Sequence, residues 1–110
     1  MRLHSDESLI EARDEIIADV LATFGADDVM LDEVSSAHRS SPRAAHYRHI
    51  AMWVHWWTCH CTQAETAWAF GRDPSTVCHA LIGIRRRMHE DPVFQYRIAS
   101  LILRRAQALA

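Results

Sequence analysis

Apolar residues recur every three or four positions along most of this chain, which is the spacing that places them on one face of an α-helix. The first such stretch runs from Ser8 to Phe24, and its apolar positions are Leu9, Ile16, Ile17, Val20, Leu21 and Phe24. Asp6 or Ser8 is suited to cap its start, and Gly25 is suited to end it. This stretch predicts an amphipathic helix that buries one face.

A short turn and a long helix are predicted next. The turn covers Val29 to Val34, with Met30, Leu31 and Val34 directed inward. Residues 35–42 are polar and read as a loop before a helix over Arg43 to His60. The core stripe of that helix is expected to be Tyr47, Ile50, Ala51, Val54, Trp57 and Thr58. A second stripe beside it comprises His49, Trp53, Trp56 and His60.

Three more helices complete the prediction. Thr62 caps the first of them with Glu65 as its capping-box partner, and Gly71 ends it. The next begins at Pro74 and points Val77, Leu81, Ile84 and Met88 inward. Asp91-Pro92 begins the last, whose buried stripe is Phe94, Ile98, Leu101 and Ile102. The predicted fold class is therefore an all-α bundle without strands, with five helices, or six if the short turn counts.

The stretch from Phe70 to Ala80 reads as a sharp turn followed by a capped helix start. Gly71 tolerates the positive φ that ends a helix, Asp73 suits the cap of the next one, and Pro74 fits its first turn. Ser75 and Thr76 then stand at the exposed end. Many ordinary helices begin in this way, but it is also how a helix-turn-helix presents its recognition helix to DNA.

The length of 110 residues predicts one domain. We expect an acidic first helix over 1–34, a basic loop over 35–43, a helix-turn-helix core over 44–88 and a C-terminal helix over 92–110. No apolar run approaches transmembrane length, and the acidic N-terminus lacks a signal peptide. Three cysteines do not form a disulfide framework. Together these features predict a cytoplasmic protein without a membrane partner.

Charge is divided along the chain. Residues 1–34 carry ten acidic residues against two arginines, a net charge of −8. Residues 35–110 carry ten arginines against four acidic residues, a net charge of +6, and the two parts add to −2. This division is compatible with a nucleic-acid face on one side of the fold, and equally with a dipolar solvated surface.

Two blocks of the sequence resemble the C-terminal DNA-binding domain of the bacterial replication initiator DnaA. Arg48-His49-Ile50-Ala51-Met52 resembles that family's Arg-Gln-Ile-Ala-Met at the start of its long helix. Residues 69–80 resemble its signature Phe-Gly-Gly-Arg-Asp-His-Thr-Thr-Val-x-His-Ala, with one glycine missing. The resemblance runs from about Leu9 to Met88. Residues 90–94 look more like small stand-alone DnaA-like proteins of alphaproteobacteria and phages.

The resemblance implies a helix-turn-helix that reads the major groove of double-stranded DNA with the start of its signature helix. Carried over by position, Asp73, Ser75 and Thr76 take the places of the signature's Asp, Thr and Thr. Base edges are expected to face Ser75, Thr76 and His79. The DNA-binding set is Arg39, Arg43, Arg48, Arg72, Asp73, Pro74, Ser75, Thr76, His79 and Arg86.

Within this set the arginines have separate expected roles. Arg39 or Arg43 would enter the minor groove. Arg48 and Arg72, with Arg85 or Arg86, would contact phosphate. One departure from the family concerns Pro74, which stands where the family has its base-reading histidine. We therefore expect a site preference different from the initiator's own box.

The expected function is sequence-specific DNA binding in the nucleoid, in transcription regulation and in a phage-related setting. A replication-associated protein that binds or competes for initiator boxes is the second interpretation. The three glycines cannot form a phosphate loop, so we expect no nucleotide and no ATPase module.

Other functional classes are less well supported by the sequence. Cysteines and histidines around His55 are metal-ligand types, but Cys59-x-Cys61 lacks the usual spacing, so neither a metal nor another cofactor is expected. No constellation of residues supports an enzyme. A protein-interaction module would use Trp53, Trp56 and the acidic first helix, unless the last helix covers these tryptophans.

Overall fold

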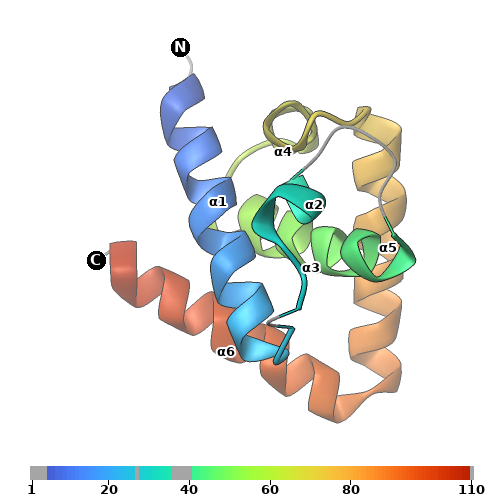
Figure 1. Cartoon of the computed structure of the whole chain (residues 1–110). Coiled ribbons are helices and arrows are strands. Elements are labelled where there is room, and N and C mark those ends of the chain that lie inside the picture. The colour runs from blue at the N-terminus through green and yellow to red at the C-terminus, as the bar shows by residue number, and fades with distance from the viewer. Residues whose placement is uncertain (1–4, 27, 36–40, 110) are drawn as a thin grey trace.

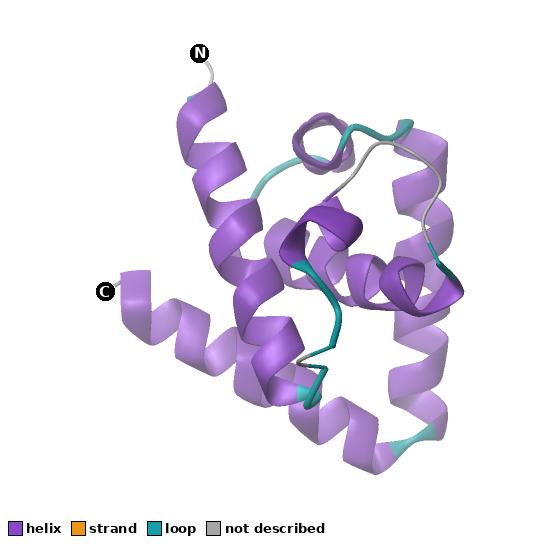
Figure 2. Ribbon diagram, in the orientation of Figure 1, coloured by secondary structure: helices purple, strands orange, loops and turns teal. Residues whose placement is uncertain are grey.

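The computed structural model describes residues 5–26, 28–35 and 41–109. Over these residues the chain forms six helices and no strand (Figures 1 and 2). The helices are α1 (Asp6–Thr23), α2 (Leu31–Ser35), α3 (Pro42–Thr58), α4 (Gln63–Phe70), α5 (Pro74–Glu90) and α6 (Pro92–Leu109). The predicted all-α fold class is confirmed, with the short turn as the sixth helix.

Short polar side chains define where the helices begin. Ser5 caps α1, because its hydroxyl accepts a hydrogen bond from the backbone N–H of Ser8 at 3.1 Å. The expectation that Asp6 or Ser8 caps this helix is therefore wrong. Ser41 caps α3 in the same way, with the N–H of Ala44 at 3.1 Å. Each cap satisfies a backbone donor that the helix itself leaves free.

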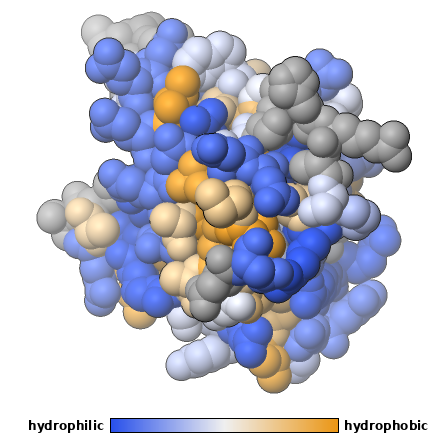
Figure 3. All heavy atoms as spheres, viewed as in Figure 1, coloured by the Kyte–Doolittle hydropathy of each residue, from blue (hydrophilic) through white to orange (hydrophobic). Residues whose placement is uncertain are grey.

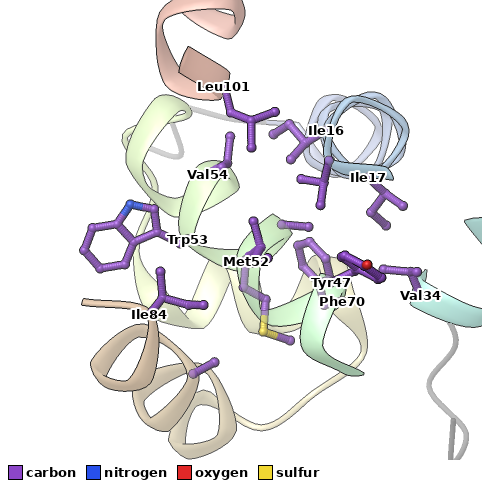
Figure 4. Packing of buried hydrophobic residues seen from close by; sticks show 14 of the residues in the cluster. Ile16, Ile17, Val34, Tyr47, Met52, Trp53, Val54, Phe70, Ile84 and Leu101 are labelled. Carbon is purple, nitrogen blue, oxygen red and sulfur yellow. The ribbon is translucent and has the colours of Figure 1, made fainter. Parts of the chain in front are cut away.

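Helix α3 runs through the middle of the molecule. It packs against α1 on one side and α5 on the other, and α6 packs against all three of these helices (Figure 1). Figure 4 shows Ile16 of α1 and Leu101 of α6 directed toward Val54 of α3. The core that these helices enclose also includes fully buried Phe70 and Phe94. Burial of this apolar surface is the main force that holds the helices together.

Two predicted core positions are wrong. Met30 is 62% exposed, and Trp57 is 51% exposed. Met30 precedes α2, a helix of little more than one turn that already turns Val34 inward. Trp57 lies in the last turn of α3, on the side that faces α5. Helix α5 does not cover its ring there, which leaves a groove between the two helices. Helical spacing identified the helix but misplaced one edge of its buried face.

A buried polar network joins α1, α3 and α4. The ring of His55 is fully buried, with its Nε2 3.0 Å from the carbonyl of Leu9 and its Nδ1 2.9 Å from the hydroxyl of Thr66. The carbonyl only accepts, so Nε2 donates and Nδ1 accepts from Thr66. The Cys61 thiol lies 3.1 Å from the same hydroxyl. Arg13 adds a hydrogen bond of 2.7 Å to the carbonyl of Ala69, which ties α1 to the last turn of α4.

Across the three described ranges, no helix combines the length and the apolar character that a bilayer span requires.

Candidate nucleic-acid interface

Helices α4 and α5 are joined by a turn of three residues and form a helix-turn-helix. The predicted capping box at the start of α4 is present, with Glu65 N–H to Thr62 Oγ1 at 3.1 Å and Thr62 N–H to Glu65 Oε1 at 3.0 Å. Gly71 ends α4 at φ 62° and ψ 38°, a left-handed conformation that glycine adopts without strain. The N–H of Arg72 donates to the carbonyl of Ala67 at 2.9 Å and closes the turn.

The start of α5 differs from the prediction in one respect. Asp73 is extended and occupies the cap position, and Pro74 stands in the first turn, as expected. The carboxylate of Asp73, however, accepts no capping hydrogen bond. Its backbone carbonyl alone accepts from the N–H groups of Thr76 at 3.0 Å and Val77 at 3.3 Å. The predicted cap is therefore correct in position but not in its side-chain bond.

One face of α5 carries an exposed stripe that begins directly after the turn. Its members, Ser75, His79, Ile82 and Arg86, are spaced by four, three and four residues and are all exposed. Thr76 lies beside this stripe and is half-buried. The opposite face packs into the core through Val77, Ala80, Leu81 and Ile84. Figure 3 shows mostly hydrophilic residues at the right-hand edge of the molecule, over α5.

Arg48 is buried, which sequence reasoning did not anticipate. Its side chain is 5% exposed, with Nε donating to the carbonyl of Val34 at 2.7 Å and a terminal nitrogen donating to that of Glu33 at 3.2 Å. Burial, together with the charge of Arg72, lowers the pKa of Arg48 to about 10. In the structure Arg48 fastens α2 to α3, and its contact with phosphate stays a prediction.

Arg72 at the turn lies within electrostatic range of Arg48 and His49 of α3. Burial first, and then the charges of Arg48 and Arg72, lower the pKa of His49. The same two arginines repel each other, and Arg72 is half-exposed at the turn itself. His49 was not among the expected site residues, although it stands next to Arg48 in the block that resembles DnaA. The positive charge of Arg72, with that of Arg48 behind it, favours an anion beside the turn.

Arg43 lies at the start of α3 and is half-exposed. It forms an ion pair with Asp28, and this hydrogen bond holds the pKa of Asp28 below its usual value. An exposed ion pair of this kind adds little to the stability of the fold, so the guanidinium can exchange Asp28 for a phosphate. Arg39, the other minor-groove candidate, lies outside the described residues.

The far half of α5 brings in a second residue that sequence reasoning missed. Arg87 donates to Nε2 of His46 at 2.8 Å, and its guanidinium lies 3.9 Å from the centre of the Phe94 ring. These contacts join α5 to α3 and α6. Arg85 and Arg86, the neighbours of Arg87, are exposed.

The tryptophans of α3 are arranged differently from the prediction. Trp53, which the alternative of a protein-interaction module would expose, is 8% exposed, and Trp56 is half-buried. Trp57, predicted in the core, is the exposed one. The rings of Trp53 and Trp57 stack, with centroids 6.1 Å apart and an angle of 9° between their planes. The last helix therefore does not cover all three rings.

The described residues contain no group of three or more histidine, cysteine, aspartate or glutamate side chains that could hold a metal ion.

The sequence matches no family model and no curated protein. Its fold matches the crystal structure of a DNA replication initiation factor, the DnaA protein, with a TM-score of 0.68 and 24% sequence identity. The match covers 90% of this chain and 30% of that chain. This chain therefore has the fold of one domain of DnaA, and it spans well under half of the initiator's length.

Proposed function

We propose that this chain binds double-stranded DNA with sequence preference and acts in transcription regulation. The observation that carries the proposal is the exposed stripe of Ser75, His79 and Arg86, which begins directly after the three-residue turn on a fold shared with a DnaA domain. We also propose that the chain is related to the DnaA family, as its two sequence blocks suggest. The part of the initiator that its fold matches would then be the initiator's DNA-binding domain.

The roles of the side chains follow from their positions. Ser75, Thr76 and His79 stand at the start of α5, where an inserted helix meets base edges in the major groove. Arg72 lies at the turn with His49 of α3 within range of its charge, and Arg86 lies further along the same face of α5, where phosphates flank the groove. The positive end of the helix dipole at the start of α5 adds to the attraction for phosphate. Arg43 or Arg39 would reach the adjacent minor groove.

Thr76 provides the sharpest test of base reading. Thr76 lies half-buried beside the stripe in a helix that has no side-chain cap bond, so Thr76→Ala should change the free energy of unfolding by less than about 0.5 kcal/mol. Affinity for a site selected from random duplexes should fall by about 1–3 kcal/mol, while affinity for unrelated duplex is retained.

The salt dependence of binding serves as the companion measurement. The affinity of the parent chain for random duplex should fall steeply with salt, since each neutralised phosphate releases counterions. Arg72→Ala should lower that slope and weaken all sequences alike. Binding that is insensitive to salt, or absent at low salt, would contradict the proposal.

A role at initiator boxes is the second candidate, favoured by the match to a replication initiator. Pro74 stands at the first position of α5 and has no side-chain donor. Pro74→His should shift the selected sequences toward the initiator box. Little stability should be lost, because the first position of a helix makes no helical N–H hydrogen bond whether proline or histidine occupies it. An unchanged sequence preference in this variant would show that position 74 does not face the bases.

A further inference from the structure

A groove runs along one side of α5 beyond the start of the exposed stripe, with which it shares Ile82 and Arg86. Its first part lies between α3 and α5 and is bordered by Trp56, Trp57 and Ile82, with Arg85 and Met88. Its second part continues past Ile82, Arg85 and Met88 to His89 near the start of α6. Because the two parts share three residues, they form one continuous surface, which we call the Trp57 groove.

The aromatic wall of this groove is held in place. Trp57 is 51% exposed, yet its ring stacks on that of Trp53, which is buried in the core. Figure 4 shows Ile84 of α5 directed toward the ring of Trp53. Trp56 contacts both rings, at centroid distances of 5.5 Å and 6.0 Å. An exposed tryptophan that is already ordered loses little conformational entropy when a partner covers it.

The charges around the groove have one sign. Arg85 lines both parts of it, Arg86 and His89 line the second part, and none of the described residues that line either part is acidic. All three basic residues are exposed. A partner that fits this surface must therefore supply apolar groups for the Trp57 wall and negative charges for the arginines.

We propose that the Trp57 groove binds an acidic amphipathic helix of a partner protein. Apolar side chains of that helix would enter between Trp57 and Ile82, and its carboxylates would meet Arg85 and Arg86. This arrangement is the helix-in-groove mode of recognition, in which anchors spaced three or four residues apart fill one apolar surface. The inference does not depend on the proposed DNA binding.

Two other occupants fit the surface less well. A second copy placed on the same face by a twofold axis would bring two arginine-lined surfaces together, which like-charge repulsion disfavours. A DNA backbone would satisfy these arginines, but it offers little apolar surface to cover Trp57 and Met88.

The probe is a labelled synthetic helical peptide with leucines spaced three or four residues apart and glutamates on its other faces. A matched peptide carries lysines in place of the glutamates. Fluorescence anisotropy with the full chain should show binding of the acidic peptide, and affinity for the lysine peptide should be at least about tenfold lower. Equal binding of the two peptides would overturn the proposal.

Variants locate the binding to the groove. Trp57→Ala should lower the affinity for the acidic peptide about tenfold. Trp68→Ala is the matched control, because Trp68 is 46% exposed but lies on α4 outside the groove, and it should bind like the parent. Arg85→Glu should reverse the preference toward the lysine peptide. Arg85 is exposed, so this variant keeps the test valid if Trp57→Ala does not fold.

The same variants are tested for self-association by sedimentation and for affinity toward random duplex. Self-association that needs Trp57 would show that a second copy occupies the groove, and loss of duplex affinity in Trp57→Ala would show that DNA does. Either result would overturn the proposal. Peptide binding that survives while duplex binding is absent would leave this inference standing and refute the proposed function alone.

Discussion

The arginines of this chain differ in burial, and the buried ones have a different role from the exposed ones. Arg48 and Arg105 are buried, the first bonded to two backbone carbonyls and the second paired with Glu15. Arg85 and Arg86 are exposed along α5. A buried guanidinium stabilises the fold through its acceptors, whereas an exposed one is available to a negatively charged partner. Residue type alone did not distinguish the two groups.

Arg48→Ala should therefore act on stability. The change leaves the carbonyls of Val34 and Glu33 without their donor and releases α2 from α3, and we expect a loss of about 2–3 kcal/mol in the free energy of unfolding. Urea denaturation measures this loss, and Arg86→Ala, at an exposed position, should stay within about 0.5 kcal/mol of the parent. A stable Arg48→Ala variant that loses duplex affinity would instead assign Arg48 to phosphate.

The two helices of the helix-turn-helix begin in different ways. Helix α4 has a reciprocal capping box between Thr62 and Glu65. Helix α5 begins with Asp73 and Pro74 but without a side-chain cap bond. The start of α5 is thus held by its proline, its backbone bonds and its packing on α3, α4 and α6. The carboxylate of Asp73 lies at the surface where we propose that DNA binds.

This difference predicts unequal effects of two similar substitutions. Thr62→Ala should lower the free energy of unfolding by about 1 kcal/mol, because the N–H of Glu65 loses its acceptor. Asp73→Ala should cost less than about 0.5 kcal/mol, since no cap bond is lost. Thermal unfolding of the two variants side by side measures the difference. Equal losses would mean that the Asp73 carboxylate does cap α5 in solution.

At the scale of the molecule, α3 separates two surfaces of opposite charge. Helix α1, on one side of α3, carries Asp6, Glu7, Glu11, Asp14, Glu15 and Asp19 (Figure 1). Helix α5, on the other side, carries Arg85, Arg86 and Arg87. A net charge of −2 therefore conceals a basic side. Surface charges are screened over about 10 Å at 0.1 M salt, so a phosphate beside α5 responds mainly to the nearby arginines.

The stability of the whole molecule should depend on pH through two histidines of α3. Burial lowers the pKa of both His46 and His49, and the positive charges of Arg87 and Arg48 lower them further. Near pH 6.5 these two histidines therefore become protonated in the unfolded chain but stay neutral in the folded chain. Stability should be constant above that pH and should fall as the pH drops through it toward the folded-state pKa values.

Melting temperatures at about pH 7.5 and about pH 5.5 measure this fall, in the range where histidine titrates. A variant with His46→Gln and His49→Gln should show a smaller difference between the two temperatures. Thr62→Ala should lower both temperatures by similar amounts, because its lost hydrogen bond involves no histidine. A pH dependence unchanged in the double histidine variant would contradict the assignment.

The sequence by itself determined the order of the helices and the turn between α4 and α5. Apolar spacing located α1, α3, α5 and α6, and local chemistry located the turn, because a left-handed residue such as Gly71 and a capping box such as Thr62 with Glu65 act within a few residues. The same signals predicted that α5 presents Ser75 and His79 to the surface. These features are local, so they could be read from neighbouring residues alone.

Only the tertiary structure decided which polar and aromatic groups are covered. Helix α3 packs against α1, α5 and α6, so more than one of its faces is buried, and spacing along one helix does not show where each neighbour stops. Trp57, predicted in the core, is consequently exposed, while Trp53 is buried. Arg48 became a structural residue because α2 folds back over it, a contact between segments fourteen residues apart. Burial depends on where distant segments meet, and no local pattern in the sequence records that.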